Sequence, residues 1–269
     1  MQKTILYFSV FILAWVIAGC PKPGKVRKKM PRLFTINFVM ETGAEPSFMI
    51  AEDFNLDGEL DLVVTNSGDN TLSYFKGKGD GTFKDQMIMK TGADPICVVT
   101  ADFNNNGYPD LAVLNYRDQS ISIYLNSRFG SFRKTGLSLK PGKIPINMTS
   151  GDFNRDGIND LAVTMRYHKV MILIGKGKGR FKNPVAIPVK GQPTAIVVGD
   201  YDRNKIIDIA VALAGSGKTG VQVLWGIGNG TFDLSKIFRG GGQPLTLANI
   251  DVDSDGYDDL VTSSNVLHA

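Results

Sequence analysis

Asp53-Phe54-Asn55-Leu56-Asp57-Gly58-Glu59-Leu60-Asp61-Leu62 is the stretch that decides the fold, because four further copies of it follow along the chain. They run from Asp102 to Leu111, from Asp152 to Leu161, more loosely from Asp200 to Ile209, and from Asp251 to Leu260. Successive copies therefore begin 49, 50, 48 and 51 residues apart. Such near-constant spacing indicates tandem structural repeats, so one unit can be analysed in place of the whole chain.

Each copy carries oxygen-bearing side chains at positions 1, 3, 5 and 9, and usually a glycine at position 6. Oxygen ligands at alternate positions of a short loop suit Ca²⁺, and a backbone carbonyl at position 7 would add one more. The pattern predicts up to five structural calcium sites. The candidate ligands are Asp53, Asn55, Asp57, Glu59 and Asp61; Asp102, Asn104, Asn106, Tyr108 and Asp110; Asp152, Asn154, Asp156, Ile158 and Asp160; Asp200, Asp202, Asn204 and Asp208; and Asp251, Asp253, Asp255, Tyr257 and Asp259.

Two other interpretations of this loop compete with a structural calcium site. An EF-hand shares the first six positions but needs a Glu at position 12 and flanking helices. Here position 12 is valine or threonine, and each loop leads into a β-prone run such as Asp61 to Val64. Clusters of Asp, Asn and Gly also form ordinary turns without metal. That alternative does not account for an aspartate at position 9 in every copy.

The five copies are not equivalent as metal sites. The fifth offers four carboxylates and should bind most tightly, whereas the second offers two and should be weak. The fourth has Lys205 where the other copies have glycine, a residue that turns the chain with a positive φ. We therefore expect the fourth site to be distorted or empty.

Charge and cysteine content narrow the classes of function. The formal net charge is +4, but seven of the 30 basic residues precede residue 33, which leaves 23 against 26 acidic residues in the repeats. A mildly acidic repeat region argues against nucleic-acid binding. Of the two cysteines, Cys97 lies in an apolar run and is predicted to be a buried hydrophobe, so no disulfide framework is expected.

The N-terminus resembles a bacterial lipoprotein signal. Residues 1–19 combine Lys3 with an apolar stretch and end in Ile17-Ala18-Gly19, directly before Cys20. The resemblance implies cleavage before Cys20 and lipidation of that cysteine, so the protein would be exported and held at a membrane. In a Gram-negative cell, Pro21 after the cysteine would resemble an outer-membrane or cell-surface destination. Ordinary signal cleavage and an uncleaved anchor are the alternatives. Residues 20–32 form a basic tether.

Residues 33–269 are predicted to form one all-β domain. A strand is expected over 33–40, and each later unit holds four short strands, with the metal loop between the first two. A glycine-rich turn followed by phenylalanine also repeats, at Phe83, Phe132, Phe181 and Phe232, and we expect these rings to pack between neighbouring sheets. Tandem four-stranded units of about 50 residues are typical of β-propeller blades.

These units resemble FG-GAP/VCBS repeats, the calcium-loop blades of integrin α-subunit heads and of many bacterial surface proteins. The resemblance rests on the Asp-Phe-Asn-x-Asp-Gly-x-x-Asp-Leu loops, on Gly79 to Phe83 and Gly228 to Phe232, and on Gly92 to Pro95. It implies a propeller whose metal loops lie opposite the usual ligand surface. Four complete units and one composite or incomplete unit predict five blades, with the strand at 33–40 closing the ring. A truncated larger ring is the alternative.

The function predicted from these features is binding of a protein or glycan by a calcium-stabilised, lipid-anchored adhesion module. The candidate ligand face holds Tyr116 and Arg117 on one turn and Arg166, Tyr167 and His168 on the next. Aromatic and arginine side chains are favoured as binding anchors, although exposed turns also carry them without a ligand. The stretch from Ala212 to Thr219 fits a relaxed phosphate-loop pattern, but a strand follows it where a helix is required, so no nucleotide is expected. No catalytic set emerges, and a polysaccharide lyase or a purely structural envelope protein are the alternatives.

Overall fold

The protein is described from a computed structural model covering residues 39–139, 144–215, 218–239 and 242–264. The predicted signal peptide, Cys20, the tether and the strand expected from residue 33 to 38 lie outside these residues. Within them the chain forms strands and turns but no helix. It follows that these residues include no apolar helix long enough to cross a bilayer.

In the described part of the chain, eighteen strands form four four-stranded sheets and one two-stranded sheet. In chain order the strands are β1 (Pro46–Glu52), β2 (Asp61–Asn66), β3 (Thr71–Phe75) and β4 (Met87–Lys90); β5 (Pro95–Ala101), β6 (Asp110–Asn115), β7 (Ser120–Asn126) and β8 (Phe132–Leu139); β9 (Pro145–Gly151), β10 (Asp160–Met165), β11 (Lys169–Leu173) and β12 (Val185–Pro188); β13 (Gln192–Gly199), β14 (Asp208–Ala214), β15 (Gly220–Gly226) and β16 (Phe232–Phe238); and β17 (Pro244–Ile250) and β18 (Asp259–Ser264). Every sheet is an antiparallel meander, because each strand pairs with the next one along the chain.

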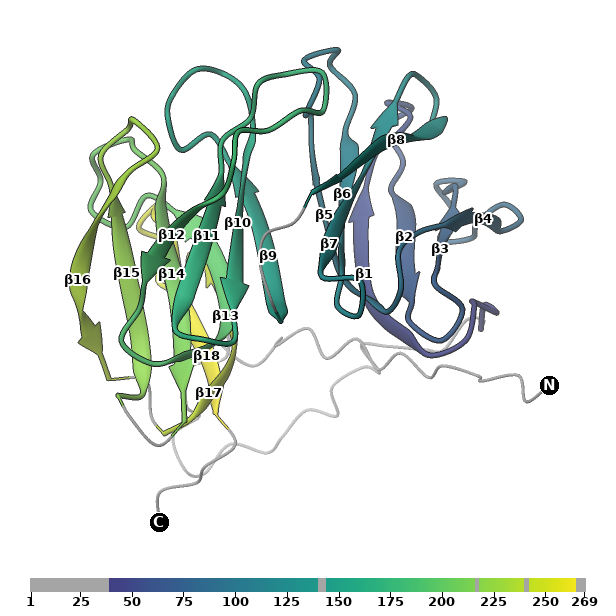
Figure 1. Cartoon of the computed structure of the whole chain (residues 1–269). Helices are drawn as coiled ribbons and strands as arrows, with labels where there is room; N and C mark the ends of the chain where they lie inside the picture. Colours follow the sequence, from purple (N-terminus) through teal and green to yellow (C-terminus); the bar gives the residue numbers. More distant parts are fainter. Residues whose placement is uncertain (1–38, 140–143, 216–217, 240–241, 265–269) are drawn as a thin grey trace, which may run out of the picture.

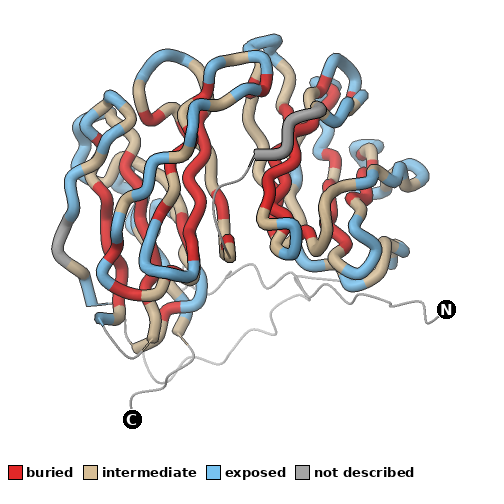
Figure 2. Tube along the Cα trace, viewed as in Figure 1, coloured by how far each residue is buried: buried red, intermediate tan, exposed pale blue. Residues whose placement is uncertain are grey.

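The sheets stack against one another as the blades of a β-propeller. Their first strands β1, β5, β9, β13 and β17 contact each other in that order, and Figure 1 shows the blades following one another from the purple first sheet to the yellow fifth. The second and third strands of the four complete blades are largely buried, as the red segments of Figure 2 show, whereas fourth strands such as β4 are exposed. Strands buried on both faces are continuously apolar rather than alternating, as Leu111 to Leu114 are.

Aromatic pairs join neighbouring blades. The phenylalanine at position 2 of a metal loop packs edge-to-face against the phenylalanine after the glycine-rich turn of the next blade. The ring centroids are 5.3 Å apart for Phe54 and Phe132, 5.7 Å for Phe103 and Phe181, and 5.6 Å for Phe153 and Phe232. The prediction that the repeated rings pack between sheets is therefore confirmed for Phe132, Phe181 and Phe232.

The blades differ from the sequence prediction at their edges. Among the described residues four blades are complete and the fifth has two strands, in agreement with the predicted composite or incomplete last unit. Residues 39 and 40 belong to no strand. The fourth strand of the first blade begins at Met87, and Phe83 before it forms an isolated bridge to Gly77. After β14 the chain enters β15, so a strand follows the phosphate-loop-like stretch. This confirms that the helix a phosphate loop needs is missing there.

Cys97 provides a direct test of the packing between blades. Its side chain is 2 % exposed, lies in the cluster with Phe103 and Met148, and has a pKa raised to about 12 by burial. In a Cys20→Ser variant, where Cys97 is the remaining thiol, we expect no reaction with Ellman's reagent until denaturant is added. Because the pKa of this thiol is raised above its ordinary value of 9.0, the folded protein holds the thiol proton more tightly than the unfolded chain does. The stability of the protein should therefore fall as pH rises from 9 towards 12. Rapid labelling of the native protein at pH 8 would contradict this packing.

Candidate metal sites in the loops between first and second strands

Each acidic loop connects the first and second strands of a blade and is shaped by the aspartate at position 1. That carboxylate accepts the backbone N–H groups of positions 5 and 6. In the first loop Asp53 accepts from Asp57 at 3.1 Å and from Gly58 at 2.7 Å. In the fifth, Asp251 accepts from Asp255 at 3.1 Å and from Gly256 at 2.9 Å. The aspartates at the start of the other three loops, Asp102, Asp152 and Asp200, make the same two bonds.

The aspartate at position 9 is the first residue of the second strand and connects the loop to the blade. In the four complete blades this residue is fully buried. Asp160 accepts the backbone N–H of Phe153 at 2.9 Å and that of Gly175 at 2.7 Å. Asp110 and Asp208 make equivalent pairs of bonds. This carboxylate therefore orients the loop in addition to offering its oxygens to a cation.

Burial of these carboxylates also changes their acidity. Loss of water around the side chain raises the pKa of Asp110 and of Asp160 to about 6, although the backbone N–H donors partly oppose the shift. The pKa of Asp208 is raised for the same reason. A divalent cation beside these groups would offset that cost by favouring the ionised form.

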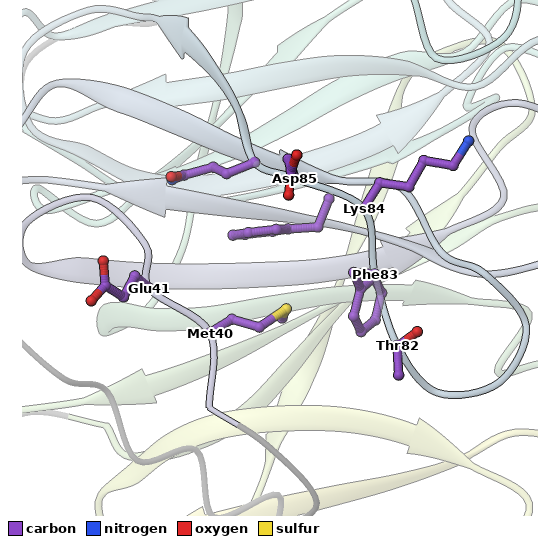
Figure 3. Close-up of a pocket in the computed structure, with 8 residues that line it drawn as sticks. Met40, Glu41, Thr82, Phe83, Lys84 and Asp85 are labelled. Carbon is purple, nitrogen blue, oxygen red and sulfur yellow. The ribbon is translucent and has the colours of Figure 1, made fainter.

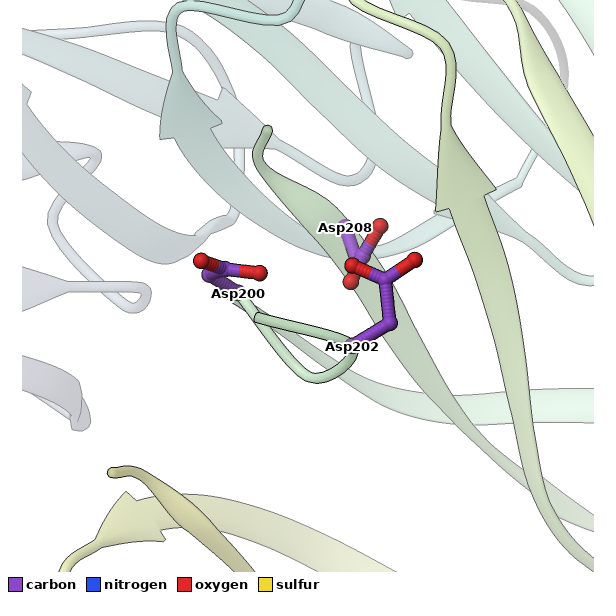
Figure 4. A group of neighbouring side chains, drawn as sticks. All are labelled: Asp200, Asp202 and Asp208. Atoms are coloured by element: carbon purple, nitrogen blue, oxygen red, sulfur yellow. The ribbon is translucent and has the colours of Figure 1, made fainter. Parts of the chain in front are cut away.

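The fourth and fifth loops bring three carboxylates together. Within each of the groups Asp200, Asp202, Asp208 and Asp251, Asp253, Asp259, one carboxylate oxygen per residue lies within 4.8 Å of the others. Figure 4 shows the side chains of the first group pointing toward one another from the loop and from the start of β14. Oxygens at this spacing fit a calcium ion with ligand distances of about 2.3–2.6 Å. Among the residues that the structure describes, no other groups of three acidic, His or Cys side chains converge in this way.

The expectation that Lys205 distorts the fourth loop is wrong. Lys205 adopts the positive φ that glycine supplies elsewhere, with φ 64° against 89° for Gly58. Its N–H donates to Asp200 at 2.8 Å, as the glycine N–H does in the other loops. A side chain at positive φ costs some conformational energy, which the loop hydrogen bonds offset. The carboxylates of this loop converge despite the lysine.

An arginine links the fourth and fifth loops. The Arg203 guanidinium lies 2.9 Å from an Asp255 carboxylate oxygen and 3.6 Å from the centroid of the Tyr257 ring. Sequence reasoning missed this residue, because position 4 of the loops has no shared residue type. Arg203 holds Asp255, a predicted ligand, toward the neighbouring blade.

In the other three loops the predicted ligand side chains pair with one another or with nearby groups of the same blade. In the first, the Lys76 ammonium lies 3.0 Å from Asn55 Oδ1 and 3.0 Å from Asp57 Oδ2, and lowers the pKa of Asp57. In the second, the Asn104 amide donates to both oxygens of Asp110, and Asn106 Nδ2 donates to the Asn126 carbonyl. In the third, Asn154 Nδ2 donates to Asp156 at 2.8 Å.

The predicted position 7 ligands close these loops through their backbone. The N–H of each residue donates to the side chain at position 5, over distances of 2.9 to 3.1 Å. These residues are Glu59, Tyr108, Ile158 and Tyr257.

The candidate ligand face lies at the opposite ends of the strands. Tyr116 and Arg117 occupy the turn between β6 and β7, and Arg166, Tyr167 and His168 that between β10 and β11. All but the half-buried Tyr116 are exposed. Backbone bonds from Tyr116 to Asp94 and from Arg166 to Ile144 hold each turn against the connection that leads into its own blade. The two turns belong to adjacent blades and share one face because each joins a second strand to a third.

A hollow of about 330 Å³ lies on the first blade, lined by Met40, Glu41, Phe75 and residues 82–86. Figure 3 shows Glu41 and Lys84 on opposite sides of it. None of the residues predicted from the sequence as metal or ligand contacts lines this hollow.

A model of the FG-GAP-like repeat matches the sequence over residues 53–113, 102–163 and 152–211. Among curated proteins, no sequence matches this chain significantly. The solved structures that share the fold include the following two. BBS1N in complex with ARL6DN has 22 % identity and a TM-score of 0.52 over 76 % of this chain. A putative 6-phosphogluconolactonase from Bacteroides uniformis ATCC 8492 has 13 % identity and a TM-score of 0.61 over 83 % of it. The chain spans 58 % and 66 % of their respective lengths.

Proposed function

Because the chain belongs to the FG-GAP-like repeat family, we propose that it is a calcium-stabilised β-propeller, anchored outside the cytoplasm through Cys20, that binds a protein or glycan partner. The observation that carries the proposal is the convergence of three carboxylates in each of the fourth and fifth loops. Three clustered negative charges repel one another, so a bound cation would stabilise the folded loop. In the fifth loop, Asp255 pairs with Arg203 and lies outside this group, so the proposed carboxylate ligands there are Asp251, Asp253 and Asp259.

The proposed binding surface is the pair of turns opposite the metal loops. Arg166, Tyr167 and His168 are exposed there, next to the turn that bears Arg117. An exposed tyrosine beside arginines offers apolar area, hydrogen bonding and positive charge together, a combination enriched at interfaces. BBS1N, a neighbour in fold, was solved in complex with ARL6DN, and we propose partner binding for this chain as well.

The test is to probe glycan and envelope-protein arrays with the purified full-length protein in 5 mM calcium. We expect a saturable partner whose binding falls at least tenfold in an Arg166→Ala/Tyr167→Ala double variant, since two anchors would be lost. The matched control is Arg128→Ala/Phe129→Ala, which removes an exposed arginine and an exposed aromatic ring from the metal-loop side. Equal losses in both double variants, or no saturable partner, would count against this surface.

Anchoring and the absence of catalysis are tested separately. A Cys20→Ser variant should be lost from the membrane fraction, because the lipid would have no attachment point.

Catalysis is tested by incubating the protein with anionic polysaccharides and following the absorbance of unsaturated products. Sustained release of such products would show that the propeller is a lyase.

A further inference from the structure

We propose that the ammonium group of Lys76 takes the place of the metal ion in the first loop. This inference rests on the proposed function in one respect, because it concerns which loops of a calcium-binding propeller take up the ion. The first loop keeps the aspartates of the repeat at positions 1, 5 and 9, so the repeat pattern predicts a metal there. The side chains around Lys76 do not fit that prediction.

The lysine nitrogen lies where a cation would bind. Lys76 Nζ is 3.0 Å from Asn55 Oδ1 and 3.0 Å from Asp57 Oδ2, which are the predicted ligands at positions 3 and 5. A calcium ion must approach the same two oxygens to about 2.3–2.6 Å. It would therefore overlap the ammonium group, and the two positive charges would repel each other. Ion and ammonium are alternatives at this position.

The remaining groups of the first loop are satisfied without metal. Asp61 accepts the Gly77 N–H at 2.8 Å, the Tyr74 hydroxyl at 2.7 Å and Asn55 Nδ2 at 2.8 Å. Asn55 is buried, and its amide bridges the lysine and Asp61. Lysine, asparagine and the two carboxylates thus form one hydrogen-bonded network inside the loop, with charge supplied by the chain itself.

The other complete blades have no such lysine. Lys76 follows Phe75, which pairs with Leu62 of the second strand. The residues at the same register are Leu125, Ile174 and Trp225, which follow Tyr124, Leu173 and Leu224. None of these side chains carries a positive charge that could replace a metal ion in a loop.

The experiment counts calcium ions bound to the full-length protein by titration calorimetry and equilibrium dialysis. Lys76→Met removes the ammonium but keeps a long apolar stem, and it should gain one site, with a dissociation constant of about 10⁻⁴–10⁻³ M. Lys78→Met removes the same charge from an exposed lysine two residues away and should leave the count unchanged. A Lys76→Met protein with the wild-type count would overturn the inference.

A second variant gives a result that does not depend on folding of Lys76→Met. Asp57→Asn in the wild-type background should bind as many ions as the wild type, because the first loop takes none. Loss of one ion in Asp57→Asn would overturn the inference. The outcome is separable from that of the proposed function: if the wild type binds no calcium but Lys76→Met binds one ion, the calcium proposal fails and the role of Lys76 stands.

Discussion

Chelation of calcium is expected to lower the melting temperature of the purified protein by about 10–20 °C relative to 10 mM calcium. A ligand that binds only the folded state stabilises it by about 2.7 kcal/mol per site at 100 times its dissociation constant. With dissociation constants near 10⁻⁴ M, two sites would contribute about 5 kcal/mol. For a chain of this size each kcal/mol shifts the midpoint by about 2–4 °C. Differential scanning calorimetry in EDTA and in calcium measures the shift.

Two variants of the fifth loop assign the effect to the carboxylate cluster. Asp253→Asn removes one of the three converging carboxylates, whereas Asp258→Asn removes an exposed carboxylate from the same loop that does not belong to the group. Asp253→Asn should lose about half of the calcium-dependent shift, and Asp258→Asn should keep it. A wild type that melts at the same temperature in EDTA and in calcium would contradict calcium stabilisation altogether.

The repeat made most of the fold predictable from sequence. Aspartate at position 1 and a residue of positive φ at position 6 are local requirements of one loop, so every copy shows the aspartate in sequence and four of the five show glycine. The rings of Phe132, Phe181 and Phe232 recur with the same period, and their packing between blades could be inferred because every blade must cover the face of the next. The two strands described in the fifth unit agree with the prediction of a composite or incomplete last blade.

The metal sites were less predictable, because their differences depend on residues outside the repeated pattern. Lys76 lies 15 residues after Asp61 and reaches the loop only because β3 pairs with β2. Arg203 reaches Asp255 across a blade boundary. Neither contact recurs from one repeat to the next. The anomaly visible in sequence was a lysine at a position that is apolar in the other blades, as in Leu125 and Ile174. Lys205, by contrast, led to the wrong prediction of a distorted fourth loop. The sequence shows that glycine is missing at this position, but it does not show that the lysine can adopt the same positive φ.

Replacement of Asp160 by alanine should destabilise the protein by about 3–5 kcal/mol even in chelator. The carboxylate is fully buried, and it accepts the N–H groups of Phe153 and Gly175. Each donor left without a partner costs about 1–3 kcal/mol, and the vacated space adds a cavity penalty. Urea unfolding in EDTA measures the change in free energy of unfolding. Asp156→Ala, in the exposed part of the same loop, is the matched control and should have a much smaller effect.

The Asp160→Asn variant separates the contribution of the hydrogen bonds to stability from that of the carboxylate charge. Asp160→Asn keeps one acceptor oxygen, so it should fall between alanine and wild type at pH 7. The folded-state pKa of Asp160 is about 6, above its ordinary value of 3.8, so the folded protein binds the proton more tightly than the unfolded chain. The stability from this proton is fully present below pH 3.8 and is lost as pH rises through 6. The deficit of Asp160→Asn should therefore widen as pH falls from 7 to 4. A deficit that shrinks over that range, or an alanine variant within about 0.5 kcal/mol of wild type, would show that the carboxylate does not connect loop and blade as its hydrogen bonds indicate.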